Sequence, residues 1–261
     1  MIELTAGDAR VVVDPACGGR LRSLMVDGLE LLGEERRAGK EGEESADPMT
    51  WGCFPMAPWA GRVRRGRFTF EGVEHQLPIN MPPHAIHGTV FDRPWPTSLK
   101  IGLGPDWPFE GSVEQRIDLQ PDHLRLELLV HAADGPMPTS CGWHPWFRRR
   151  LARGGTADLD LDAASMWQRD ADGIPSGDLV PPPPGPWDDC FTGLRRPPRI
   201  TWPSALTLTI ESSCQHVVVY DEPADAICVE PQTHPPDALN LGPAVVEPGR
   251  PLVADAVFRW S

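Results

Sequence analysis

Alternation of apolar and polar side chains with a period of two is the feature that most restricts how this chain folds. In residues 123–131, "HLRLELLVH", the residues Leu124, Leu126, Leu128 and Val130 share one face, opposite His123, Arg125 and Glu127. Successive side chains of a strand point to opposite faces, so the run predicts a strand with one solvated face. Such strands are typical of antiparallel sheets. Shorter alternating runs occupy residues 67–71, 158–162 and 206–210.

Three more continuous apolar runs, 10–14, 216–221 and 226–230, also predict strands, and a last strand is expected at 252–260. The 31 prolines and 25 glycines are scattered among these runs, where they favour turns between short elements. We therefore expect an all-β protein, a large antiparallel β-sandwich, with residues 1–261 as a single domain.

Helical signals are confined to residues 235–240, "PPDALN", where a proline near the start favours a single turn. The acidic segment 33–48 has no apolar face, and we expect a solvated loop there. The proline-rich segment 180–187, "VPPPPGPW", predicts an extended surface loop rather than a linker, because strand patterns continue on both sides of it.

The net charge of −13 disfavours nucleic acid and anionic membranes as partners, because both repel an acidic surface. No apolar run approaches the ~20 residues of a membrane helix, and the first residues lack the pattern of a signal peptide. The six cysteines have no CxxC spacing, so we expect reduced thiols, a cytoplasmic location, and neither a metal nor another cofactor.

Reactive polar residues gather among prolines, glycines and aromatic residues in four stretches. One is "CGWHPWFRRR", in which His144 is enclosed by Trp143, Pro145, Trp146 and Phe147. The four stretches are residues 57–68, 84–95, 142–147 and 227–240.

Taken in order, these stretches resemble the aldose 1-epimerase (galactose mutarotase) family. A glycine–arginine pair precedes "GRFTFEG", and "LPIN", "HG" and "RPW" follow; "HPWF" and then "EPQT" with "PDALN" complete the set. The resemblance extends over roughly residues 10–260 and implies the galactose mutarotase type of β-sandwich. It also implies a cofactor-independent isomerase that interconverts the α and β anomers of a free hexose such as glucose or galactose.

The resemblance assigns roles to individual residues. It implies that His144 is the general acid on the ring oxygen and that Glu230 is the general base on the anomeric hydroxyl. His87 and Arg62 are implied to bind the sugar hydroxyls and the ring oxygen. Asp188, with Asp189 beside it, is implied to hold further hydroxyls.

Two residues depart from the family pattern. Gly61 replaces an asparagine, which removes an amide hydrogen bond, and Trp146 replaces a tyrosine, which removes a hydroxyl and enlarges the wall. We expect Trp146 to contact the substrate, because a flat ring packs against the C–H surface of a pyranose.

The chemistry requires these residue types. Ring opening of a hemiacetal removes a proton from O1 and adds one to the ring oxygen, so we expect an acid and a base on opposite sides of the ring. An imidazole exchanges protons near neutral pH, and such help is typically worth ~10²–10⁴-fold. Glu230 precedes Pro231, where we expect the strand to end, and burial there raises the proton affinity of a carboxylate.

Each residue also has a purely structural interpretation. His144 is alternatively a packed histidine that donates to a backbone carbonyl, and Glu230 a salt-bridge partner at a strand end. His84 and His87 are alternatively a metal pair, and Asp188 part of a turn. The arginines at 64, 65 and 67 form a solvated strand face, and the tryptophans at 51, 59, 95 and 143 are core residues by default.

Two other functions remain open at this level. A hexose-6-phosphate 1-epimerase needs cations at the pocket mouth, for which the candidates are Arg64, Arg65, Arg93 and Arg148–Arg150. A non-catalytic sugar-binding or sensing protein needs neither an acid nor a base. In each case the partner is a small sugar, and the chain is a monomer or a homodimer.

Overall fold

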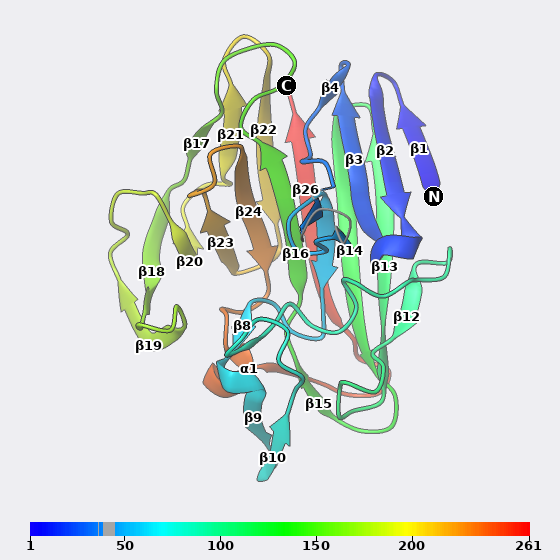
Figure 1. Cartoon of the computed structure of the whole chain (residues 1–261), viewed down its shortest axis with the longest axis vertical. Coiled ribbons are helices and arrows are strands. Elements are labelled where there is room, and N and C mark those ends of the chain that lie inside the picture. The colour runs from blue at the N-terminus through cyan, green and yellow to red at the C-terminus, as the bar shows by residue number, and fades with distance from the viewer. Residues whose placement is uncertain (36, 39–44) are drawn as a thin grey trace.

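Two large antiparallel sheets pack face to face in the computed structural model, which describes residues 1–35, 37–38 and 45–261 (Figure 1). The predicted antiparallel β-sandwich is therefore confirmed. Within the described residues, no helix has the length and apolar character needed to cross a bilayer.

The first sheet has eleven strands and carries both chain segments that contain His144 and Glu230. Its strands, in spatial order, are β1 (Ile2–Ala6), β2 (Ala9–Asp14), β3 (Arg20–Val26), β7 (Cys53–Met56), β16 (Gly142–Arg148), β24 (Ala226–Gln232), β23 (His216–Tyr220), β20 (Asp188–Leu194), β18 (Ala163–Arg169) and β19 (Pro175–Val180), with β4 (Leu29–Glu30) paired to β3.

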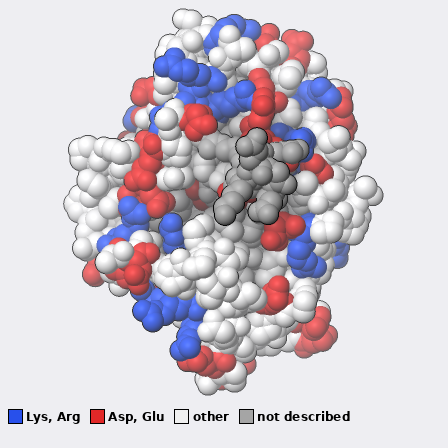
Figure 2. All heavy atoms as spheres, viewed as in Figure 1, with Lys and Arg blue, Asp and Glu red and all other residues white. Residues whose placement is uncertain are grey.

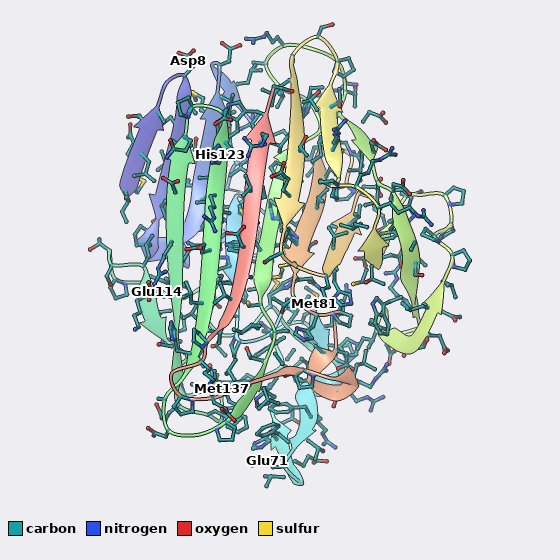
Figure 3. The ribbon with its side chains drawn as sticks, turned by 180° about the vertical axis from the view of Figure 1, so that it is seen from behind. Asp8, Glu71, Met81, Glu114, His123 and Met137 are labelled. Carbon is teal, nitrogen blue, oxygen red and sulfur yellow. The ribbon has the colours of Figure 1, made fainter. Side chains whose placement is uncertain are left out.

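The second sheet has seven strands, and Figure 3 shows its outer side, where Glu114 and His123 lie. In spatial order the strands are β12 (Lys100–Gly102), β13 (Gly111–Gln120), β14 (His123–Ala132), β26 (Leu252–Trp260), β22 (Leu206–Ser212), β21 (Arg199–Trp202) and β17 (Asp158–Asp160).

Short elements complete the chain, several of them at the lower end in Figure 1. They are the strand pairs β8 (Arg62–Val63) with β11 (Ala85–Ile86), β9 (Arg67–Phe70) with β10 (Val73–Gln76), β15 (Met137–Thr139) with β25 (Ala244–Val246) and β5 (Arg37–Ala38) with β6 (Ser45–Ala46), the 3₁₀ turns η1 (Pro15–Cys17) and η2 (Arg64–Gly66), and the helix α1 (Ala238–Leu241).

The main core lies between the two sheets and contains the apolar face predicted for residues 123–131. Leu124, Leu126, Leu128 and Val130 of β14 are all fully buried in it. Each such side chain contributes about 1.5–3 kcal/mol relative to an exposed position. Alternate residues of the eleven-stranded sheet pack against this face from the other side of the core. The residues between them point to the opposite face of that sheet.

A second apolar cluster lies on that other face, around the middle strands β7, β16 and β24. Phe54, Met56, Trp146, Ala226 and Cys228 are its buried members on these strands. The pocket described below is built over this cluster, so the alternation of these three strands separates core residues from pocket residues.

Two loop and strand-end predictions are corrected by the structure. In segment 33–48, where a loop was expected, the short strands β5 and β6 pair in antiparallel fashion, while residues 36 and 39–44 lie outside the described residues. The strand containing Glu230 continues to Gln232, because pairing with β23 persists through Pro231 and Gln232. Towards β16, no residue pairs form between Cys228 and Gln232, which accommodates the missing N–H of Pro231. Of the loop predicted over residues 180–187, Val180 is the last residue of β19 and the others contain no strand, while α1 begins within the expected turn.

Candidate active site

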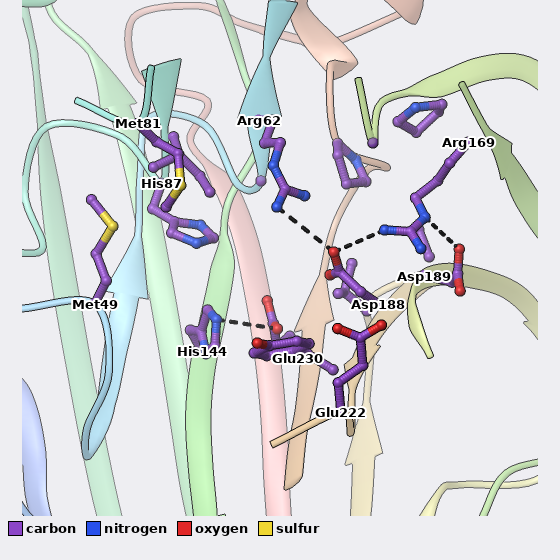
Figure 4. Close-up of a pocket in the computed structure, with 18 of the residues that line it drawn as sticks. Met49, Arg62, Met81, His87, His144, Arg169, Asp188, Asp189, Glu222 and Glu230 are labelled. Atoms are coloured by element: carbon purple, nitrogen blue, oxygen red, sulfur yellow. Dashed lines mark hydrogen bonds and ion pairs between the residues drawn. The ribbon is translucent and has the colours of Figure 1, made fainter. Parts of the chain in front are cut away.

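A pocket of about 340 Å³ opens on the face of the eleven-stranded sheet that carries the second apolar cluster. Its floor is made by residues of β16, β24, β23 and β20, and its walls come from β8, residues 86–87, residues 47–50 and the β18–β19 hairpin (Figure 4). All six predicted site residues line it: Arg62, His87, His144, Trp146, Asp188 and Glu230.

His144 reaches the pocket because of the alternation along β16. Trp143 and Phe147 point into the sandwich core, whereas His144 and Trp146 lie on the pocket face. The His144 ring stacks on Trp146, with centroids 5.2 Å apart and planes 9° apart, and on Phe54 of β7, with centroids 4.9 Å apart. The aromatic enclosure therefore consists of Trp146 and Phe54. The prediction that Trp143 and Phe147 belong to it is wrong, since neighbours in a strand face opposite ways.

Glu230 lies beside His144 on the adjacent strand, and Nε2 of His144 is 3.2 Å from Oε1 of Glu230. Both residues are buried, with exposed fractions of 6% and 3%. The expectation that the acid and base face each other across a sugar ring is wrong, because they touch side by side. The geometry still suits a hemiacetal, since the ring oxygen and the anomeric oxygen are bonded to the same carbon.

Burial changes the proton affinities of both groups. It raises the pKa of Glu230 well above its ordinary value, and the nearby charge of Asp188 raises it further. Burial also lowers the pKa of His144. Burial therefore disfavours the charged form of each group. Among the described residues, Nδ1 of His144 has no hydrogen-bond partner within the geometric limits of such a bond.

His87 lies in the wall next to His144, with the two ring centroids 5.1 Å apart. Its backbone has a φ of 61°, and its N–H donates to the Gly61 carbonyl. Gly88 follows with a φ of 85°, and a Cβ there would lie 1.9 Å from the Ala57 carbonyl oxygen. The "HG" dipeptide thus needs glycine for close backbone approach. Burial lowers the pKa of His87 well below its ordinary value, so its imidazole is neutral.

Arg62 and Asp188 meet at the side of the pocket away from His144 (Figure 4). Nη2 of Arg62 is 3.7 Å from Oδ2 of Asp188, and Nη1 of Arg169 is 2.8 Å from the same oxygen. Asp189 also lines the pocket, 2.8 Å from Nε of Arg169. Burial raises the pKa of Asp188, and the two arginines oppose this shift. Arg169 was not among the predicted residues, and no motif in its own segment pointed to it.

The "PDALN" segment positions Arg62. Asp237 donates its backbone N–H to the Arg62 carbonyl at 2.6 Å, and its Oδ1 accepts from the Arg64 N–H at 2.9 Å and from Asn240 at 2.8 Å. Gly61 has a φ of 71°, and a Cβ there would lie 2.8 Å from Pro236, so a side chain at this position is excluded by close packing. Asp237 is part of the "PDALN" motif, but the motif by itself does not indicate which group its side chain contacts.

The positions of His84 and His87 do not support the alternative interpretation of these residues as a metal pair. Nδ1 of His84 accepts from the Arg65 N–H, and His84 does not line the pocket. Over the described ranges, one group of three residues could offer ligand atoms to a metal ion, with these atoms all within 4.8 Å of one another: His144, Cys228 and Glu230.

The cations suggested for a phosphate site lie outside the pocket lining, and the side chains of four of the six have other partners. Arg64 pairs with Asp170 and Asp172, and Arg93 donates to the carbonyls of Thr89, Gly102 and Leu103. Arg148 pairs with Glu34, and Arg149 donates to the carbonyls of Asp221 and Pro223. Basic and acidic side chains are interspersed over this face of the molecule, without a basic half (Figure 2).

The chain is similar to known proteins over nearly its whole length. A family model described as "Aldose 1-epimerase" matches residues 1–259. The uncharacterized protein YphB of Escherichia coli strain K12 is 26% identical over 254 residues, which cover 84% of this chain and 83% of YphB.

Solved structures share the fold. A galactose mutarotase-like protein from Clostridium acetobutylicum superposes with a TM-score of 0.83 at 16% identity, covering 99% of this chain and 94% of the other. A galactose 1-epimerase from Lactobacillus acidophilus NCFM superposes with a TM-score of 0.78 at 18% identity, covering 99% and 92%. At these identities the superpositions establish the β-sandwich type alone.

Proposed function

The chain belongs to the aldose 1-epimerase family, and from this premise we propose that it is a mutarotase, which interconverts the α and β anomers of a free hexose such as glucose or galactose. The observation that supports the proposal most directly is the contact between His144 and Glu230 at the floor of the pocket. A pocket that only binds sugar needs neither group, whereas ring opening needs a proton donor and a proton acceptor that reach two oxygens on one carbon.

In the proposed mechanism, Glu230 carries a proton in the free enzyme, and this proton first moves to Nε2 of His144, 3.2 Å from Oε1 of Glu230, as the sugar binds. The Glu230 carboxylate then takes the proton from O1, the bond between C1 and the ring oxygen breaks, and the His144 imidazolium protonates the ring oxygen. Rotation about C1–C2 turns the other face of the aldehyde to the hydroxyl, and the transfers run in reverse on ring closure. The number of protons on the enzyme is unchanged after each half-reaction.

The remaining predicted residues bind the sugar in this proposal. The neutral imidazole of His87 and the Arg62–Asp188 pair provide hydrogen-bonding groups for hydroxyls, while Trp146 contributes apolar surface beside His144. We expect His87→Ala chiefly to raise KM, because its ring binds substrate without exchanging a proton with it.

A neutral sugar suits the charges of the pocket better than a sugar phosphate. The arginines that line it, Arg62 and Arg169, are already paired with Asp188 and Asp189. Asp47 and Glu222 also line the pocket, and additional carboxylates repel a phosphate dianion. We also propose that the protein acts in the cytoplasm, because the six cysteines have neither CxxC spacing nor the compact spacing of a disulfide framework.

Polarimetry of freshly dissolved α-glucose or α-galactose tests the proposal. We expect the protein to accelerate the optical change, and Glu230→Gln to abolish the acceleration while sugar binding persists. Glu222→Gln is the matched control, since Glu222 lines the same pocket from an exposed position and has no part in the chemistry. Sugar binding without acceleration by the unaltered protein supports the sensing function instead, and acceleration restricted to hexose 6-phosphates supports the phosphate enzyme.

A further inference from the structure

Arg169 enters the pocket from the outer edge of the large sheet. It is the last residue of β18, and the register between β18 and β19 shifts between Trp167 and Arg169. Such a bulge redirects side chains, and bulges are frequent next to active sites. Both Trp167 and Arg169 line the pocket, so this hairpin contributes an apolar ring and a cation to the same wall.

The guanidinium of Arg169 uses only some of its N–H donors on the protein. Nη1 donates to Oδ2 of Asp188 at 2.8 Å, and Nε lies 2.8 Å from Oδ1 of Asp189. A guanidinium carries more donors than these two contacts require, and it cannot lose its charge. Within residues 1–35, 37–38 and 45–261, the other N–H groups of Arg169 have no acceptor, and the two carboxylates hold the plane of the guanidinium in one orientation at the pocket wall.

Asp188 lies between two arginines that come from different walls of the pocket (Figure 4). Arg62 and Arg169 both approach its Oδ2, at 3.7 and 2.8 Å. In the described part of the chain, Oδ1 of Asp188 has no hydrogen-bond donor. The three side chains therefore form a row in which Asp188, the acceptor, lies between two donors, Arg62 and Arg169. Oδ1 of Asp188 remains able to accept hydrogen bonds from a ligand.

We propose that Arg169 is a specificity-determining residue that, with Asp188 and Arg62, recognises two neighbouring hydroxyl groups of a neutral pyranose on the edge away from C1. A hydroxyl group both donates and accepts, so two adjacent hydroxyls match the row: each donates to Asp188 and accepts from one arginine. The substrate class is then an aldopyranose with an intact vicinal diol. The inference rests on the proposed function for the identity of the ligand as a sugar.

The test compares Arg169→Met, which keeps the length of the side chain and removes its donors, with the unaltered protein. Mutarotation rates are measured for glucose, galactose and the 2-, 3- and 4-deoxy derivatives of glucose. We expect Arg169→Met to raise KM for the parent sugars by about 10- to 100-fold, the effect of a lost charge-assisted hydrogen bond, with kcat changed by only about threefold. For the deoxy sugar that lacks the recognised hydroxyl, KM should rise much less.

Arg195→Met is the matched control, because Arg195 also pairs with an aspartate but lies outside the pocket lining. We expect it to leave KM for every sugar unchanged. Arg169→Lys retains the charge without the planar donor geometry, and we expect an intermediate KM. It also keeps the test decisive if the methionine variant does not fold.

Equal increases in KM for all sugars, or a loss of kcat at constant KM, overturn the inference, because a merely structural residue does not distinguish one hydroxyl from another. Titrations of tryptophan fluorescence separate this result from the proposed function, since Trp146 and Trp167 line the pocket. If the protein binds sugars with this discrimination but does not accelerate mutarotation, the inference holds and the proposed function fails. If mutarotation is fast and Arg169→Met raises KM equally for all the sugars, the proposed function holds and the inference fails.

Discussion

Nε2 of His144 and Oε1 of Glu230 are 3.2 Å apart although their strands, β16 and β24, are distant in the chain and adjacent only in the sheet. Each group is the polar neighbour of the other in a buried site, so removal of one leaves the other without this contact. Stability and activity are therefore coupled at this pair, and variants that keep its shape are the informative ones.

His144→Gln retains a polar nitrogen near the position of Nε2 but cannot exchange protons near neutral pH. We expect kcat for mutarotation to fall by ~10²–10⁴-fold, the usual contribution of a general acid–base group. His84→Gln is the control, because His84 is also buried but lies outside the pocket lining, and its kcat should stay within about twofold. Near-normal turnover of His144→Gln in polarimetry would falsify the assigned role.

Glu230 should make the protein less stable as the pH rises. Its folded-state pKa is raised, so above the ordinary value of 4.5 the folded state keeps a proton that the unfolded state has lost, and the free energy of unfolding falls with increasing pH. Glu230→Gln removes this titration. Urea unfolding between about pH 5 and 8 should show a shallower decline for Glu230→Gln than for the unaltered protein. Equal slopes contradict the buried, protonated carboxyl.

Gly88 should tolerate no side chain, unlike a glycine of similar backbone conformation elsewhere. A Cβ at Gly88 would lie 1.9 Å from the Ala57 carbonyl oxygen, whereas nothing lies within 4 Å of a Cβ at Gly72, which has a φ of 81°. We expect Gly88→Ala to lower the free energy of unfolding by at least about 3 kcal/mol and to raise KM through displacement of His87. Gly72→Ala should lower the free energy of unfolding by only about 1 kcal/mol. If chemical denaturation shows equal losses for the two variants, the contact with the Ala57 carbonyl is not what requires glycine at position 88.

Asp237 should be needed for its acceptor oxygen rather than for its charge. Asp237→Asn keeps a carbonyl oxygen for the Arg64 N–H, whereas Asp237→Ala leaves that donor without its partner. We expect a loss of about 1–3 kcal/mol for the alanine variant and a smaller loss for asparagine. KM should follow the same order, because the backbone beside Arg62 is held by Asp237. If both variants bind sugar and unfold alike, Asp237 does not position Arg62.

Local patterns in the sequence were sufficient to predict the fold class and eight of the strands. The alternation in residues 123–131 predicted β14 and its buried face, because the direction of a side chain in a strand depends only on its position along that strand. The ordered motifs likewise predicted six residues that line one pocket. Their catalytic and binding roles stay predictions until the kinetic measurements above are made.

Tertiary structure decided what depends on the order of strands in space. Phe54 stacks on His144 because β7 pairs with β16, and Arg169 reaches Asp188 because β18 lies next to β20. The same pairing places Glu230 directly against His144, instead of across a ring from it. The pKa shifts of His144 and Glu230 are caused chiefly by burial, which is a property of the whole pocket. Contacts between distant segments and desolvation are not local properties of a chain, and no pattern of neighbouring residues encodes them.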